Sequence, residues 1–188
     1  MIRQTLLFAL PLVLAGCNNS EPEPVRDAPA KTVDRASQTD PQLDGAKIVV
    51  DANGFGAKGA TPLRFGVSRA EADAVAARAF GAKGEESSNA ECGAGPMDFS
   101  TFGPLQVAYL DGKLAGWFLR EGEGVVTSDG IRPGITLEAL KEERQLRQID
   151  STLPGEFAYT TADYGTIRGF AEGGKITALQ AGVSCFFR

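Results

Sequence analysis

The chain has 188 residues and a formal net charge of −5, from 24 acidic and 19 basic side chains. This acidic balance, together with the lack of a Lys/Arg run, argues against a nucleic-acid-binding protein, which needs a positively charged surface. The sequence contains no histidine, so catalysis by a histidine base and metal sites built on histidine are excluded. We expect neither a cofactor nor a metal.

Residues 1–16 predict a lipoprotein signal peptide. Arg3 precedes an apolar run from Leu6 to Leu14, which is shorter than the roughly 20 helical residues that a bilayer requires. A buried N-terminal helix or strand is the alternative interpretation. The segment Leu14-Ala15-Gly16-Cys17 resembles a bacterial lipobox, and this resemblance implies cleavage before Cys17 and lipidation of its thiol.

The next segment, residues 17–45, predicts the lipidated cysteine followed by a disordered tether. It contains four prolines and almost no large apolar side chains, so it cannot bury enough surface to offset its ordering entropy. Asn18 follows the cysteine where enterobacterial lipoproteins held in the inner membrane have aspartate. By that resemblance, we expect a protein anchored by lipid in the outer membrane and facing the periplasm.

Residues 46–188 predict one domain of the α+β class. Ser68 with Glu71 forms a capping-box pattern, and an apolar stripe follows at helical spacing until Gly81; the stripe comprises Ala72, Val75, Ala76, Ala79 and Phe80. Thr136 is predicted to cap a second, more polar helix from Leu137 to Ile149.

Two hairpins are predicted, one after each helix. The first joins Leu105–Leu110 to Lys113–Leu119 through Asp111-Gly112, and the second joins Thr166–Glu172 to Lys175–Gly182 through Gly173-Gly174. This order of a helix and then antiparallel strands occurs twice. It suggests an internal duplication, with one repeat over about residues 60–120 and another over about 125–188; chance similarity is the alternative.

The helix starts Gly66-Val67-Ser68 and Gly134-Ile135-Thr136, with the two hairpins, resemble tandem repeats of known envelope proteins. They are similar to β-lactamase-inhibitor-like domains and to small outer-membrane lipoproteins of the SmpA/OmlA type. The resemblance implies protein binding or assembly at the cell envelope without catalysis, and it assigns no site residue by position.

Trp117, the single tryptophan, is a candidate partner-binding residue. Counting outward from the Asp111-Gly112 turn places Val107 and Tyr109 on an apolar face, and Trp117 on the opposite, mixed face. An aromatic side chain on an uncovered face is a common interface anchor. Leu179 occupies the equivalent position in the second hairpin. The alternative is that the other repeat, or the segment Ile48–Val50, covers Trp117.

The leading functional hypothesis is therefore a non-catalytic, lipid-anchored binding or scaffold module whose partner is another envelope protein. The alternative is a small carboxylate-dependent hydrolase acting on envelope polysaccharide. The acidic candidates are Glu85-Glu86 and Glu121 with Glu123, both expected in glycine-bordered loops, and Glu142-Glu143 on the second helix. Such positions are typical of a solvated surface, whereas a pocket with two facing carboxylates would favour the enzyme.

Cys92 and Cys185 are the two cysteines that remain once Cys17 carries lipid. An exported protein enters an oxidising compartment, which favours a disulfide between them. Two reduced, buried cysteines that pack as small apolar residues are the alternative.

Overall fold

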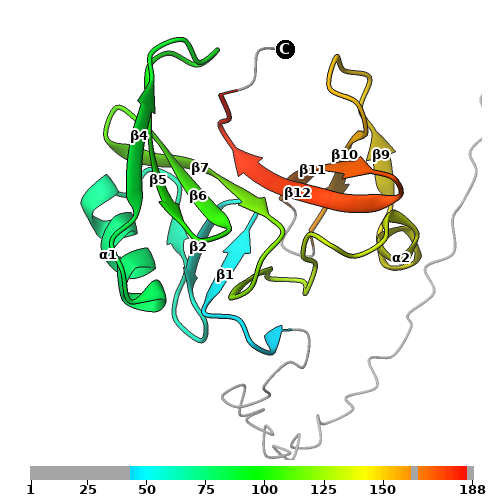
Figure 1. The fold of residues 1–188 in the computed structure, drawn as a ribbon, viewed down its shortest axis with the longest axis horizontal. Helices are drawn as coiled ribbons and strands as arrows, with labels where there is room; N and C mark the ends of the chain where they lie inside the picture. The colour runs from blue at the N-terminus through cyan, green and yellow to red at the C-terminus, as the bar shows by residue number, and fades with distance from the viewer. Residues whose placement is uncertain (1–42, 162–164, 186–188) are drawn as a thin grey trace, which may run out of the picture. The chain divides into compact units, whose positions relative to one another are not determined.

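The computed structural model describes residues 43–161 and 165–185, and within them the chain forms two helices and two β-sheets (Figure 1). The predicted α+β class is confirmed, although the domain contains more strand than the sequence indicated. The signal peptide, Cys17 and most of the predicted tether lie outside the described residues.

The larger sheet is antiparallel, and its strands follow the order β4 (Glu85–Asn89), β5 (Met97–Phe102), β6 (Leu105–Leu110), β7 (Lys113–Arg120), β12 (Lys175–Gly182), β11 (Thr166–Glu172), β10 (Glu156–Thr160) and β9 (Leu146–Gln148). The smaller sheet, which the sequence did not predict, has the order β3 (Leu63–Arg64), β2 (Gly54–Ala57), β1 (Ile48–Asp51) and β8 (Val125–Thr127). Its β1–β8 pair is parallel.

Helix α1, Arg69–Phe80, matches its prediction closely. The Ser68 hydroxyl accepts a hydrogen bond from the Glu71 backbone amide, and Gly81 ends the helix in the left-handed conformation at φ 73°. Both ends therefore satisfy backbone groups that the helix itself leaves unpaired. The predicted apolar stripe faces the main core, with Ala72 and Ala76 fully buried.

Helix α2, Leu137–Glu143, begins after Thr136 as predicted but ends six residues before Ile149. Arg144 is already extended, at φ −140° and ψ 148°, and the chain continues into the edge strand β9, Leu146–Gln148. Pairing of β9 with β10 supplies this segment's backbone hydrogen bonds. Sheet pairing thus overrides a weak helical preference in a segment whose apolar stripe is incomplete.

Both predicted hairpins are present, and the first contains a β-bulge. Tyr109 pairs with Leu114, but the next pair is Ala108 with Gly116, so Ala115 is an extra residue in β7. A bulged residue moves every later side chain of its strand to the opposite face. The face assignment counted from the turn is therefore wrong for β7 beyond Ala115.

The second hairpin carries a bulge at the same distance from its turn. Ala171 pairs with Ile176 and Phe170 with Ala178, which leaves Thr177 as the extra residue in β12. Each bulged residue is the third residue of its strand. Every residue of β7 therefore corresponds to the residue of β12 that is 62 positions later in the chain, as Ala115 does to Thr177.

Strands β7 and β12 lie side by side and antiparallel at the centre of the larger sheet, with Phe118 opposite Gln180. The two helix starts contact their hairpins alike: the amide of Gly66 donates to the carbonyl of Leu114, and that of Gly134 to Ile176, each at 2.7 Å. Both glycines have positive φ, 99° and 95°, a conformation that other residues rarely adopt.

One face of the larger sheet, here called the inner face, packs against α1, α2 and the smaller sheet to form the main core. Its buried sheet residues alternate with those of the opposite, outer face. The buried inner-face residues are Phe102, Leu105, Val107, Tyr109, Leu114, Trp117, Leu119, Phe157, Tyr159, Ile167, Ile176, Leu179 and Ala181.

Candidate binding face

The outer face carries a row of directly paired residues that crosses all eight strands of the larger sheet. Gln180 lies near its middle, with Phe118 on one side and Arg168 on the other. From edge to edge the row reads Glu85, Thr101, Gln106, Phe118, Gln180, Arg168, Ala158 and Arg147. Among the described residues, the helices and the smaller sheet contribute to the core on the other side.

A cavity of about 330 Å³ opens on this face over the first half of the sheet, and Phe99, Gln106, Phe118 and Gln180 contribute to its lining. The Arg120 guanidinium lies over the Phe118 ring, 4.9 Å from the ring centre. Apolar rings, amide groups and one cation thus line the same hollow, as in sites that bind small molecules or peptide side chains.

A disulfide between Cys92 and Cys185 fixes one wall of this cavity and confirms the predicted pairing. The two Cα atoms lie 4.4 Å apart, within the range that the bond requires. Asn89 of β4 also contacts Cys185, with 3.3 Å between Nδ2 and Sγ. The bridge therefore holds the segment that follows β12 against β4 and β5, beside a small apolar cluster that includes Met97 and Phe99.

Gln180 is a buried polar residue of the outer face. It is only 3% exposed, and neither its Oε1 nor its Nε2 has a hydrogen-bond partner in the described part of the chain. A buried carboxamide without partners costs free energy, and such groups in folded proteins call for an explanation. The side chain lines both the cavity of about 330 Å³ and a neighbouring one of about 260 Å³.

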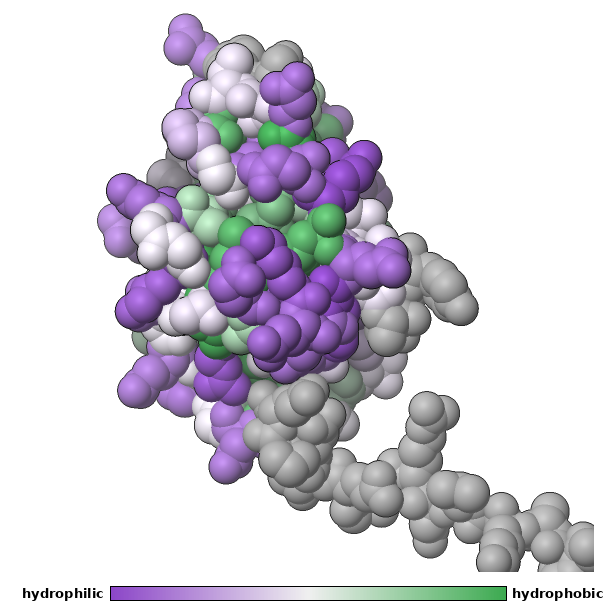
Figure 2. All heavy atoms as spheres, turned by 90° about the vertical axis from the view of Figure 1, so that its right-hand side faces the viewer, coloured by the Kyte–Doolittle hydropathy of each residue, from purple (hydrophilic) through white to green (hydrophobic). Residues whose placement is uncertain are grey.

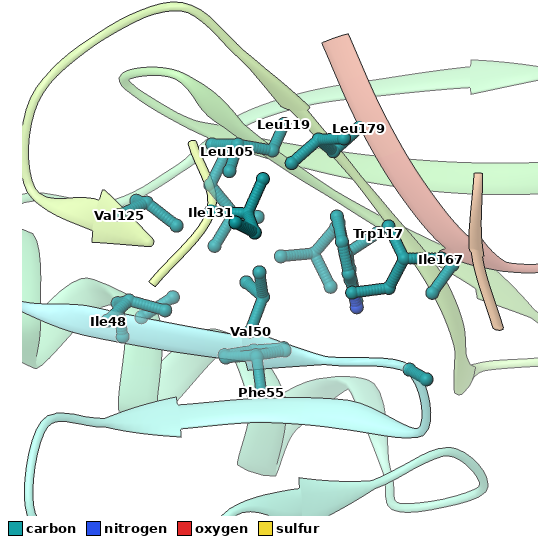
Figure 3. Packing of buried hydrophobic residues seen from close by; sticks show 14 of the residues in the cluster. Ile48, Val50, Phe55, Leu105, Trp117, Leu119, Val125, Ile131, Ile167 and Leu179 are labelled. Carbon is teal, nitrogen blue, oxygen red and sulfur yellow. The ribbon is translucent and has the colours of Figure 1, made fainter. Parts of the chain in front are cut away.

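The placement of Trp117 on an uncovered face is wrong. Trp117 is 2% exposed and points into the core among Val50, Phe55 and Ile167 (Figure 3). The bulge at Ala115 turns it to the inner face, where the smaller sheet covers it, as the alternative interpretation anticipated. Leu179 is also fully buried on the inner face, so neither side chain is available to a partner.

The acidic candidates lie at three separate places. Glu85 and Glu86 belong to the edge strand β4 rather than to a loop, and the Glu86 carboxylate pairs with Arg69 at 2.8 Å. Glu121 and Glu123 are exposed between β7 and β8, and Glu142-Glu143 are exposed at the end of α2. Figure 2 shows hydrophilic side chains around smaller hydrophobic patches on the side of the domain that carries α2 and β9.

Two partly buried polar clusters adjoin the core, each around a buried tyrosine. Tyr109 donates a hydrogen bond to the Asp73 carboxylate at 2.6 Å, and Arg69 pairs with the same carboxylate at 3.2 Å. Burial, and then the Asp73 carboxylate, raise the pKa of Tyr109. In the second half, burial and then the charge of Asp129 raise the pKa of Tyr159. Both tyrosines stay protonated at neutral pH. Tyr109 packs in the core and donates a hydrogen bond, whereas the buried Tyr159 hydroxyl has no hydrogen-bond partner among the described residues.

Gln180, Arg168 and Arg147 are not among the residues that the sequence pattern predicted. The available signal was the alternation of polar and apolar residues along β11 and β12, in which Arg168 and Gln180 are polar residues between apolar or small neighbours. Using that signal requires the register between the two halves of the sheet, which the spacing of turns alone does not provide.

No described helix is long and apolar enough to cross a membrane. Comparison of the sequence with protein-family models and with curated proteins found no match, and comparison of the fold with solved structures found none.

Proposed function

We propose that the protein is a lipid-anchored binding module of the cell envelope, without catalytic activity, which uses the outer face of its larger sheet to hold another envelope protein. The lipobox Leu14-Ala15-Gly16-Cys17 supports the anchor. Several acyl chains at about 0.8 kcal/mol per buried CH₂ make a lasting attachment. The tether to residue 45 then separates the domain from the bilayer.

We also infer that the domain arose by duplication of a helix-and-sheet unit. The two bulges at Ala115 and Thr177, at the same distance from their turns, support this inference. So do the matching hydrogen bonds from Gly66 and Gly134. Duplication around the β7–β12 pair explains why the outer face runs without interruption across both halves.

The observation that carries the proposal is the lining of the outer face beside Gln180. A sheet face that only met water would carry solvated polar side chains. This one instead combines a cavity of about 330 Å³ with a buried carboxamide that lacks partners. Both features are typical of a surface that a ligand completes.

The test places a photo-crosslinking amino acid at Gln106, on the outer face, in the full chain expressed in its native host. A matched variant carries it at Lys58, which is exposed beyond β2 of the smaller sheet. We expect a discrete protein adduct from position 106 and none from position 58. Equal crosslinking from both positions, or from neither, would argue against a binding face.

The anchor is tested separately with Cys17→Ser. The wild-type chain should be acylated, as mass spectrometry would show, and should enter the detergent phase on phase separation. The variant should do neither. An unchanged mass and unchanged partitioning would refute lipidation without bearing on the sheet face.

A further inference from the structure

Two arginines flank a small residue on the outer face of the second half of the sheet. Arg168 on β11 and Arg147 on β9 pair with Ala158 of β10 from opposite sides. Two strand spacings separate their backbones, about 10 Å. Ala158 is 2% exposed, and its methyl group leaves no large side chain between the two arginines in this row.

Neither guanidinium is neutralised by the described residues. Among the described residues, the ion pairs involve other cations, and no hydrogen bond from the Arg147 or Arg168 side chain occurs. Glu156, two residues before Ala158 on the same face, is fully buried and engaged in its own interaction. The two guanidinium groups together with the Glu156 carboxylate still carry a net positive charge.

The same arginines and Gln180 line one cavity of about 260 Å³, together with Thr166. Its polar lining contrasts with the aromatic residues of the neighbouring cavity. Gln180 follows Arg168 directly in the cross-strand row. The site therefore offers two cations, one hydroxyl and one buried carboxamide whose donor and acceptor are both unused.

We propose that this cavity binds an acidic peptide segment, with a side-chain carboxylate between Arg147 and Arg168 and a peptide group on Gln180. A guanidinium matches a carboxylate through two parallel hydrogen bonds. The Gln180 carboxamide can pair with peptide backbone in both directions, since its NH₂ group donates to the C=O, and its Oε1 accepts from the N–H, of one extended residue. Inorganic phosphate supplies negative charge for the two guanidinium groups but no extended backbone for Gln180, so it completes the site only in part.

This inference rests on the proposed role of the outer face and names the chemistry of the partner. The probe is a pentapeptide, acetyl-Ser-Ala-Glu-Ala-Ser-amide, whose single charge is the glutamate side chain. Its glutamine counterpart and inorganic phosphate serve as comparison ligands. Binding to the full-length Cys17→Ser protein is measured by calorimetry and by amide chemical shifts.

We expect the glutamate peptide to bind at least tenfold more tightly than the glutamine peptide and than phosphate. Arg147→Gln and Arg168→Gln should each weaken its binding about tenfold. Arg78→Gln, at an exposed position in the last turn of α1, should leave binding unchanged. Equal affinity for both peptides, or equal affinity for phosphate, would overturn the assignment.

Gln180→Leu separates binding from folding. Replacing an unsatisfied buried carboxamide with an apolar side chain should raise the melting temperature, while affinity for the glutamate peptide falls. A lower melting temperature with unchanged affinity would show that Gln180 only packs. If the peptide fails while crosslinking at position 106 succeeds, the partner chemistry is wrong and the binding face stands; if both fail, the proposed function falls too.

Discussion

The indole Nε1 of Trp117 donates a hydrogen bond to the backbone carbonyl of Asp51 at 2.7 Å, and so joins the two sheets of the domain. Trp117 belongs to β7 and Asp51 ends β1. The Asp51 carboxylate in turn accepts hydrogen bonds from the Arg64 guanidinium at 2.8 Å and from the Asn53 amide at 2.7 Å. The turn between β1 and β2 is thus fixed against the centre of the larger sheet.

Replacing Trp117 should therefore destabilise the domain rather than weaken partner binding directly. Trp117→Ala leaves a large cavity in the core, and we expect a loss of about 3–5 kcal/mol in the free energy of unfolding. Trp117→Phe keeps most of the apolar contact but leaves the Asp51 carbonyl without its donor, and should cost about 1–3 kcal/mol. Urea unfolding followed by circular dichroism measures both.

Tryptophan fluorescence gives an independent check on the same residue. The protein has a single tryptophan, so its emission should be blue-shifted in the folded chain and move to the red on unfolding. Emission at the wavelength of a solvated indole in the folded protein would contradict the buried position.

Deleting Ala115 should be far more damaging than deleting an ordinary surface residue. Without this bulged residue, Trp117 and Leu119 turn to the outer face if the hairpin keeps its turn. Each large apolar side chain contributes about 1.5–3 kcal/mol when buried, so the two together account for much of the stability of a typical domain.

The matched deletion of Thr177 should have a comparable effect, because its bulge sets the face of Leu179. Deletion of Glu123, an exposed residue between β7 and β8, is the control and should be tolerated. A cooperative thermal transition near that of the wild type after deletion of Ala115 would show that the bulge does not set the register.

The two bulges could not be predicted from the sequence, whereas the helix ends and the hairpin turns could. The cap at Ser68, the stop at Gly81 and both hairpin turns depend on residues a few positions apart, and all were predictable from local patterns. Ala115 has no such signature, since its role depends on which residue of β7 is left without a partner in β6. The same holds for the site: Gln180, Arg168 and Arg147 come together only through pairing between distant strands.

The disulfide should stabilise the domain mainly by restricting the unfolded chain. Cys92 and Cys185 are 93 residues apart in sequence, and closure of a loop of that size contributes up to about 4–5 kcal/mol in the chain-entropy treatment. The double variant Cys92→Ser/Cys185→Ser should unfold at lower urea concentration than the oxidised protein. It should match the wild type measured in reductant.

Thiol labelling checks the oxidation state itself. In Cys17→Ser protein exported to the periplasm, no thiol should react after denaturation without reductant, and two should react after reduction. Two reactive thiols before reduction would show that the bridge does not form during export.

The last prediction concerns alkaline pH. Burial raises the pKa of Tyr109 and of Tyr159 above the ordinary value near 10, and the Asp73 and Asp129 carboxylates raise them further. The unfolded chain therefore loses these protons at lower pH than the folded one. Their contribution to stability is complete below about pH 10 and falls as pH rises beyond it, by about 1.4 kcal/mol per pH unit for each tyrosine.

Urea midpoints measured from pH 8 to 11 should decline above pH 10, and Tyr109→Phe should make that decline shallower. Absorbance at 295 nm should show fewer tyrosinates in the folded protein than in the urea-unfolded chain at the same pH. Ionisation of all three tyrosines with the unfolded chain's midpoint, in a protein that circular dichroism shows to be folded, would contradict the buried clusters.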